Sequence, residues 1–121
     1  MKLWLDDRIL PPNEDVSSLE PARDWVVVQD PLVFRGVLPL VWPKLTVISF
    51  DHDMQCFRGD REYTGYTAMT WIEEWLASER LVDPIPVLCV HTSNAAMYHK
   101  MQDLANALMN RYRVRKAPVI V

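Results

Sequence analysis

The sequence predicts one α/β domain over residues 1–121, in which a parallel five-stranded sheet is covered by helices on both faces. Short apolar segments of strand type alternate along the chain with segments of helical periodicity, which is typical of right-handed crossovers in a parallel sheet. The length of 121 residues and an apolar share of 50% suit a single domain with its own core. We therefore expect a three-layer architecture.

Five apolar segments predict the strands: "KLWL" (2–5), "WVVVQ" (25–29), "KLTVIS" (44–49), "PVLCV" (86–90) and a last one within 112–121. The first ends in charged residues, and the second is β-branched. The third and fourth are near-continuous apolar runs, typical of strands buried on both faces of a parallel sheet. Five strands in a chain of this length favour the flavodoxin-like order 2-1-3-4-5.

The first two connections differ in character. Three prolines fall in the polar segment 9–23, which predicts that the first crossover helix is shortened or absent. Asp30 and Pro31 suit the N-cap and first position of the next helix. Gly36 and Pro39 should keep that helix short or bent.

Two later helices follow from caps and apolar stripes. Thr64 can cap a helix that runs to about Arg80, and Ser93 or Asn94 can cap the next one. Both helices carry apolar residues at the three-to-four spacing of one buried face. These residues are Ala68, Met69, Ile72, Trp75 and Leu76 in the first helix and Met97, Met101, Leu104, Ala105 and Leu108 in the second.

Composition restricts the function classes. A formal net charge of −3 gives no support for nucleic-acid binding through a broadly basic surface, although the segment 110–116 could form a local basic patch. Cys56 and Cys89 do not have a metal-binding or redox spacing. The N-terminus does not resemble a signal peptide, and no apolar run approaches the roughly 20 residues that span a bilayer. We expect a cytoplasmic protein without a membrane partner.

Polar groups follow three of the predicted strands: "DDR" (6–8), "DHD" (51–53) and "HTSN" (91–94). In the order 2-1-3-4-5, the carboxyl ends of the first, third and fourth strands are neighbours, and ligands bind at that switch point. The three polar segments, far apart in sequence, should therefore form one site.

The carboxylates of this site predict a metal ion. Asp6, Asp7, Asp51 and Asp53 would bring up to four negative charges close together. Like charges at such range raise one another's pKa values or recruit a cation. Mg²⁺ binds through one or two carboxylates together with waters and phosphate oxygens, which makes it the expected cofactor.

The histidines predict proton transfer. His52 and His91 follow neighbouring strands, from which two imidazoles can act as general base and general acid on one phosphodiester. Neighbouring aspartates would fix the tautomer of each ring. Asp51 is the third catalytic candidate, as a nucleophile in a covalent variant of the reaction.

Four residues are candidates for phosphate binding. Thr92, Ser93 and Asn94 can cap the helix that follows them, and the free N–H groups of that helix can bind an anion. Arg8 lies beside the aspartate pair and can pair with a phosphate oxygen.

Four motifs in order resemble the cyclic-phosphate-processing receiver-like domains, a divergent branch of the response-regulator receiver fold. They are "LWLDDR" (3–8), "SFDHDM" (49–54), "TGYTAMTWIEEWL" (64–76) and "VHTSN" (90–94). The resemblance spans roughly residues 3–94. It implies a receiver-like fold and a role in processing nucleotide or RNA ends that carry a cyclic phosphate.

Individual receiver roles carry over by motif. The resemblance assigns Mg²⁺ binding to Asp6 and Asp7, the phosphoacceptor position to Asp51, and the hydroxyl position after the fourth strand to Thr92 or Ser93. Lys116 in "RKAP" is the candidate for the receiver lysine.

The leading hypothesis is a Mg²⁺-assisted phosphoesterase, resembling a cyclic phosphodiesterase, that acts on a cyclic or terminal phosphate of a nucleotide or RNA. A metal-independent reaction through the two histidines and a Mg²⁺-dependent nuclease on the same carboxylates are open alternatives. A further one is a receiver-like regulatory module, either phosphorylated on Asp51 or binding only a protein partner. The sequence does not give the oligomeric state.

Overall fold

The computed structural model describes residues 1–7 and 25–115. Its strands are β1 (Lys2–Leu5), β2 (Trp25–Val28), β3 (Val47–Phe50), β4 (Cys56–Arg58), β5 (Arg61–Tyr63) and β6 (Val87–Val90). Its helices are α2 (Pro31–Val41), α3 (Gly65–Ala77) and α4 (Ala95–Arg111), with a short 3₁₀ turn at Trp42–Lys44. The predicted alternation of strands and helices is confirmed.

The main sheet is parallel and has the order β2-β1-β3-β6. This is the predicted order for the first four strands of a flavodoxin-like sheet. Of the predicted fifth strand, the described part of the chain contains one parallel bridge, between Ile85 and Val114. The segments 8–24 and 116–121, where the first crossover and Lys116 were placed, lie outside the described residues.

The helices begin at the predicted caps. The Asp30 carboxylate accepts a hydrogen bond from the N–H of Leu32, and Pro31 is the first residue of α2. Thr64 caps α3 in a reciprocal arrangement with Thr67. The Asn94 side chain, one of the two predicted caps of α4, accepts from the N–H of Met97. Capping residues thus defined the helix starts correctly from the sequence.

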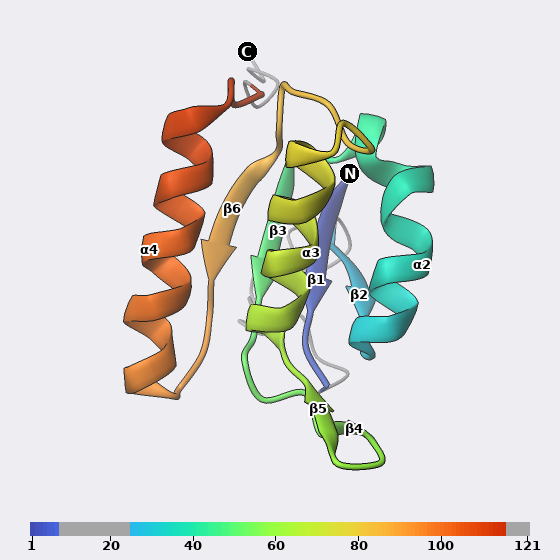
Figure 1. The fold of residues 1–121 in the computed structure, drawn as a ribbon, viewed down its shortest axis with the longest axis vertical. Helices are drawn as coiled ribbons and strands as arrows, with labels where there is room; N and C mark the ends of the chain where they lie inside the picture. The colour runs from blue at the N-terminus through green and yellow to red at the C-terminus, as the bar shows by residue number, and fades with distance from the viewer. Residues whose placement is uncertain (8–24, 116–121) are drawn as a thin grey trace, which may run out of the picture.

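One face of the sheet forms the core with α2, α3 and α4, which lie side by side in front of it in Figure 1. Alternate strand residues point to that face and are fully buried: Leu3, Leu5, Ile48, Phe50 and Leu88. The helices contribute Phe34, Leu38, Met69, Ile72 and Met101 to the same cluster. This packing fixes the strands, and with them the side chains that follow their carboxyl ends.

The opposite face carries Trp4, Ser49 and Cys89, which lie next to one another in the strand register. Two residues further along each strand, the same alternation directs Asp6, Asp51 and His91 to that side of the sheet. The strand pairing therefore sets these three polar side chains in one row.

Between β3 and α3 the chain forms an antiparallel β-hairpin of β4 and β5. Its two-residue turn is Gly59–Asp60, with φ of +63° at Gly59. Glycine in the first turn position is typical of a type II′ hairpin turn. The hairpin extends from the end of the sheet toward which β1 and β3 run (Figure 1).

Among residues 1–7 and 25–115, no helix is both long and apolar enough to cross a membrane.

Candidate functional site

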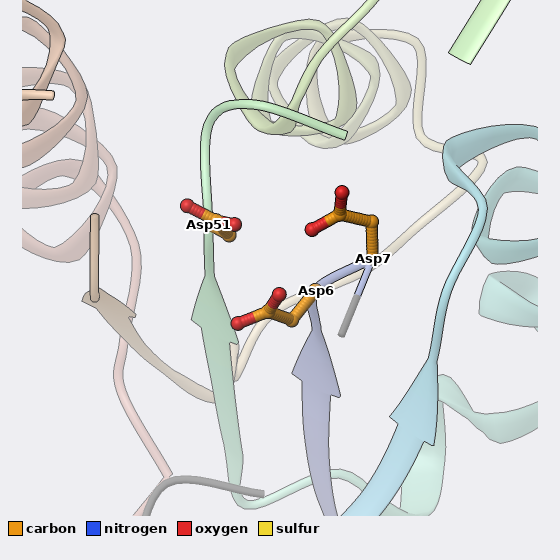
Figure 2. Close-up of side chains that lie close together, drawn as sticks. All are labelled: Asp6, Asp7 and Asp51. Carbon is orange, nitrogen blue, oxygen red and sulfur yellow. The ribbon is translucent and has the colours of Figure 1, made fainter. Parts of the chain in front are cut away.

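Three carboxylates meet at the carboxyl end of the sheet (Figure 2). Asp6 and Asp7 follow β1, and Asp51 follows β3. The backbone N–H of Asp51 donates to the carbonyl of Leu5 at 2.8 Å, so the strand pairing continues up to the site. One ligand oxygen from each carboxylate lies within 4.8 Å of the others. The convergence of these three residues, predicted from topology, is confirmed.

The electrostatics of Asp51 indicate a site that favours added positive charge. Burial raises the pKa of the Asp51 carboxyl above its ordinary value, and the neighbouring Asp6 and Asp7 raise it further. Hydrogen bonds from the N–H of His52 and from the side chain of Thr92 act in the opposite direction. The net direction is upward, because removal from water and like-charge repulsion both disfavour the carboxylate form.

The geometry suits a small hard cation. One ligand oxygen from each of the three carboxylates lies within 4.8 Å of the others, so all three could contribute to one ion. Carboxylate oxygens are the ligands that Mg²⁺ takes from proteins. Asp6 is buried and Asp7 is the most exposed of the three, so an ion here would keep access to water.

Gly65, the first residue of α3, packs directly on the backbone of Asp51. A Cβ atom at this position would lie 1.5 Å from the carbonyl oxygen of Asp51, a clash that excludes any side chain here unless the backbone moves. The N–H of Gly65 donates to the carbonyl of His52 at 2.9 Å. The glycine therefore lets the start of α3 hold the backbone that presents the Asp51 carboxylate.

His91 belongs to the site through Asp6. Its Nε2 lies 3.1 Å from Oδ2 of Asp6, and its Nδ1 lies 2.7 Å from Oγ of Ser49. The ring stacks on Trp4 with centroids 3.3 Å apart and planes at 8°. Both ring nitrogens thus contact side chains, one on Asp6 directly after β1 and the other on Ser49 within β3.

His52 and Asp53 form a second pair. Nδ1 of His52 lies 2.8 Å from Oδ1 of Asp53, and the N–H of His52 donates to Oδ1 of Asp51. Asp53 is not one of the three residues whose ligand oxygens gather, and its side chain is 53% exposed. Asp53 was predicted as a metal ligand, but in this structure its side chain contacts the His52 ring and lies outside the cluster of Asp6, Asp7 and Asp51.

The predicted phosphate-binding residues take different positions. Thr92 accepts a hydrogen bond from the N–H of Asn94 at 3.1 Å and lies beside Asp51. Asn94 caps α4, and Ser93 between them is exposed. Arg8 lies outside the described residues.

Three contributors to the site were not predicted from the sequence: Trp4, Ser49 and Gly65. Ser49 stands inside an apolar run, where a hydroxyl is a weak signal for function. A buried strand serine two positions before a site aspartate nevertheless points to the same face as that aspartate, and this spacing could have identified it.

A family model described as "Cyclic-phosphate processing Receiver domain" matches residues 1–107 of the chain. The match covers every described strand and all but the last residues of α4. Comparisons with curated proteins and with solved structures give no match.

Proposed function

Because the chain belongs to the family of cyclic-phosphate processing receiver domains, we propose that it is a cation-assisted phosphoesterase. Its substrate would be a cyclic or terminal phosphate of a nucleotide or an RNA end. The observation that carries the proposal is the gathering of Asp6, Asp7 and Asp51 within 4.8 Å at the carboxyl end of the sheet. A cation between them would allow such an acidic site to bind a phosphate.

Asp6, Asp7 and Asp51 would hold that cation, with Mg²⁺ as the best candidate. When bound, Mg²⁺ supplies Lewis-acid stabilisation of the charge on the phosphoryl oxygens. The chain's own part is to fix the three carboxylates on adjacent strands, with the Asp51 backbone held by α3 at Gly65. The backbone carbonyl of Asp53 is a further candidate ligand.

His52 is the best candidate for proton transfer. Its Nδ1 faces the Asp53 carboxylate, an acceptor-only group that favours a proton on that nitrogen. Nε2 has no hydrogen-bond partner within the described parts of the chain and would accept a proton from water as it attacks phosphorus. A P–O bond of the cyclic phosphate then breaks, and the oxygen that leaves phosphorus is protonated by His52 or by water.

Thr92, Ser93 and Asn94 would contact the phosphate together with the N-terminus of α4. The hydroxyl of Ser93 is exposed at this helix start, and the free N–H groups of a helix start attract anions. Arg8, beside the aspartate pair in sequence, is the candidate cation for the remaining phosphate oxygens.

The direct test is turnover of a substrate panel by the purified protein. The panel holds 2′,3′- and 3′,5′-cyclic nucleotides and RNA with a cyclic-phosphate end, each with Mg²⁺ or with a chelator, followed by ³¹P NMR. We expect at least one member to open to a phosphomonoester in Mg²⁺ and not with the chelator. Absence of turnover for the whole panel would contradict the proposal.

Replacing His52 with alanine is expected to lower turnover of the accepted substrate by roughly 10²–10⁴-fold, the usual contribution of a general acid or base. Initial rates at saturating substrate measure the effect, and circular dichroism checks the fold. His99→Ala is the matched control, because His99 is exposed on α4. Equal rates for the two variants would remove His52 from the reaction.

A regulatory module is the second candidate, favoured by the position of Asp51 directly after β3 with Thr92 after β6. Such a module would be phosphorylated on Asp51 by acetyl phosphate or bind beryllofluoride there. Labelling of the wild type that is absent in Asp51→Asn, without turnover of any substrate, would favour this candidate over the phosphoesterase.

A further inference from the structure

Four side chains, Trp4, Ser49, His91 and Asp6, contact one another on the face of the sheet opposite α2, α3 and α4 and lead to the carboxylate cluster. Ser49 Oγ lies 2.7 Å from Nδ1 of His91, and Nε2 of the same ring lies 3.1 Å from Oδ2 of Asp6. Trp4 stacks on the ring. Ser49 is 4% exposed and Asp6 is 0% exposed, so water competes little for these contacts. The link runs across β3, β6 and β1 without a backbone group in between.

The two hydrogen bonds of His91 can be given a direction by starting from the Asp6 carboxylate, which accepts when it is ionised. An ionised Asp6 has no proton to donate, so Nε2 of His91 must carry the proton in their contact. In the neutral ring Nδ1 is then an acceptor, and the Ser49 hydroxyl donates to it. A donating Ser49 hydroxyl would stabilise the tautomer of His91 that presents an N–H to Asp6.

Packing fixes the plane in which this N–H points. The Trp4 ring lies 3.3 Å from the His91 ring between centroids, at an interplanar angle of 8°. Trp4 is itself held edge-on by Trp25 at 5.3 Å. Stacking on one side and a hydrogen bond at each nitrogen leave the imidazole little freedom to rotate.

We infer that Ser49 is a positioning residue for the cation site, acting through His91 on Asp6. The inference rests on the cation-binding part of the proposed function and assigns His91 to orienting a ligand rather than to direct proton transfer. Ligating carboxylates in metal sites are themselves hydrogen-bonded, and loss of such partners lowers metal affinity. Ser49 does not contact Asp6 itself; it holds the His91 ring, and the other nitrogen of that ring contacts Asp6.

The test is Mg²⁺ affinity, measured by calorimetric titration of the wild type, Ser49→Ala and Cys89→Ala. Cys89 is the matched control, since it neighbours Ser49 in the strand register and has no hydrogen bond to His91. We expect Ser49→Ala to bind Mg²⁺ about 10-fold more weakly, the low end for outer partners of a metal ligand. Cys89→Ala should match the wild type.

A spectroscopic measurement separates positioning from general loss of packing. In ¹⁵N NMR of the folded proteins, the wild type and Cys89→Ala should show a proton on Nε2 of His91 and a hydrogen-bonded Nδ1. In Ser49→Ala, the Nδ1 resonance should move toward that of a nitrogen without a donor. An unchanged resonance or an unchanged Mg²⁺ affinity in Ser49→Ala overturns the inference alone. Absence of Mg²⁺ binding by the wild type overturns it together with the cation role in the proposed function.

Discussion

Replacing Gly65 with alanine is expected to lower the free energy of unfolding by about 3 kcal/mol, the upper range for overpacking a filled site. The added Cβ would lie 1.5 Å from the Asp51 carbonyl oxygen, which is backbone and cannot rotate away. The start of α3 must therefore move away from the strand end that carries Asp51. Urea unfolding followed by circular dichroism measures the loss.

Gly36→Ala is the matched control for this substitution. Gly36 lies within α2, and nothing approaches within 4 Å of a Cβ built there. Alanine in an exposed helix interior is more favourable than glycine by about 0.5–1 kcal/mol, so this variant should be slightly more stable than the wild type. Equal stability of the two variants would show that α3 does not depend on close contact with Asp51. Mg²⁺ affinity should fall in Gly65→Ala alone.

Replacing Asp51 with asparagine is expected to stabilise the cation-free protein at neutral pH by about 1 kcal/mol, a typical size for a single substitution. Burial, Asp6 and Asp7 all raise the pKa of Asp51, so its ionised form is unfavourable in the folded state. A neutral amide removes that penalty. The gain corresponds to a rise of about 4 °C in Tm for a domain of this size.

The effect of Asp51→Asn depends on pH with a defined sign. At low pH Asp51 is protonated in both folded and unfolded chains, and the variant gains nothing over the wild type. As pH rises through the ordinary aspartate pKa of about 3.9, the unfolded chain ionises first, which draws the wild type toward unfolding. The stability difference should therefore open above about pH 4 and become constant above the raised pKa of folded Asp51.

Asp103→Asn is the control for this series, because Asp103 is an exposed aspartate on α4. Thermal unfolding of the three proteins from pH 3 to pH 8 measures the difference. Two results would contradict an unfavourable carboxylate at Asp51 in the folded protein. One is an Asp51→Asn variant that is less stable than the wild type at neutral pH; the other is a stability difference between the two proteins that does not change with pH. Added Mg²⁺ should reverse the order by stabilising only the proteins that keep Asp51.

The strand order and the three-carboxylate site could be predicted because both depend on local patterns and a topological rule. Apolar runs define the strands, and the rule for parallel sheets brings the residues after β1 and β3 together. The positions of Asp6, Asp7 and Asp51 then follow from the sequence. The family match confirms the resemblance that the four motifs indicated.

The contacts that orient the site could not be predicted in the same way. The link from Ser49 to His91 joins residues 42 positions apart and depends on the register between β3 and β6. The close approach of Gly65 depends on where α3 docks, which its own periodicity does not give. The hairpin at Gly59–Asp60 did have a local signal, since Gly-Asp between two short strands is a hairpin turn.

The central claim is that Asp6, Asp7 and Asp51 form a divalent-cation site. Calorimetric titration of Mg²⁺ into the wild type, Asp51→Asn and Asp103→Asn tests it most directly. The account predicts one binding event in the wild type and in Asp103→Asn, with loss of that event in Asp51→Asn. No binding by the wild type, or equal binding by Asp51→Asn, would contradict it.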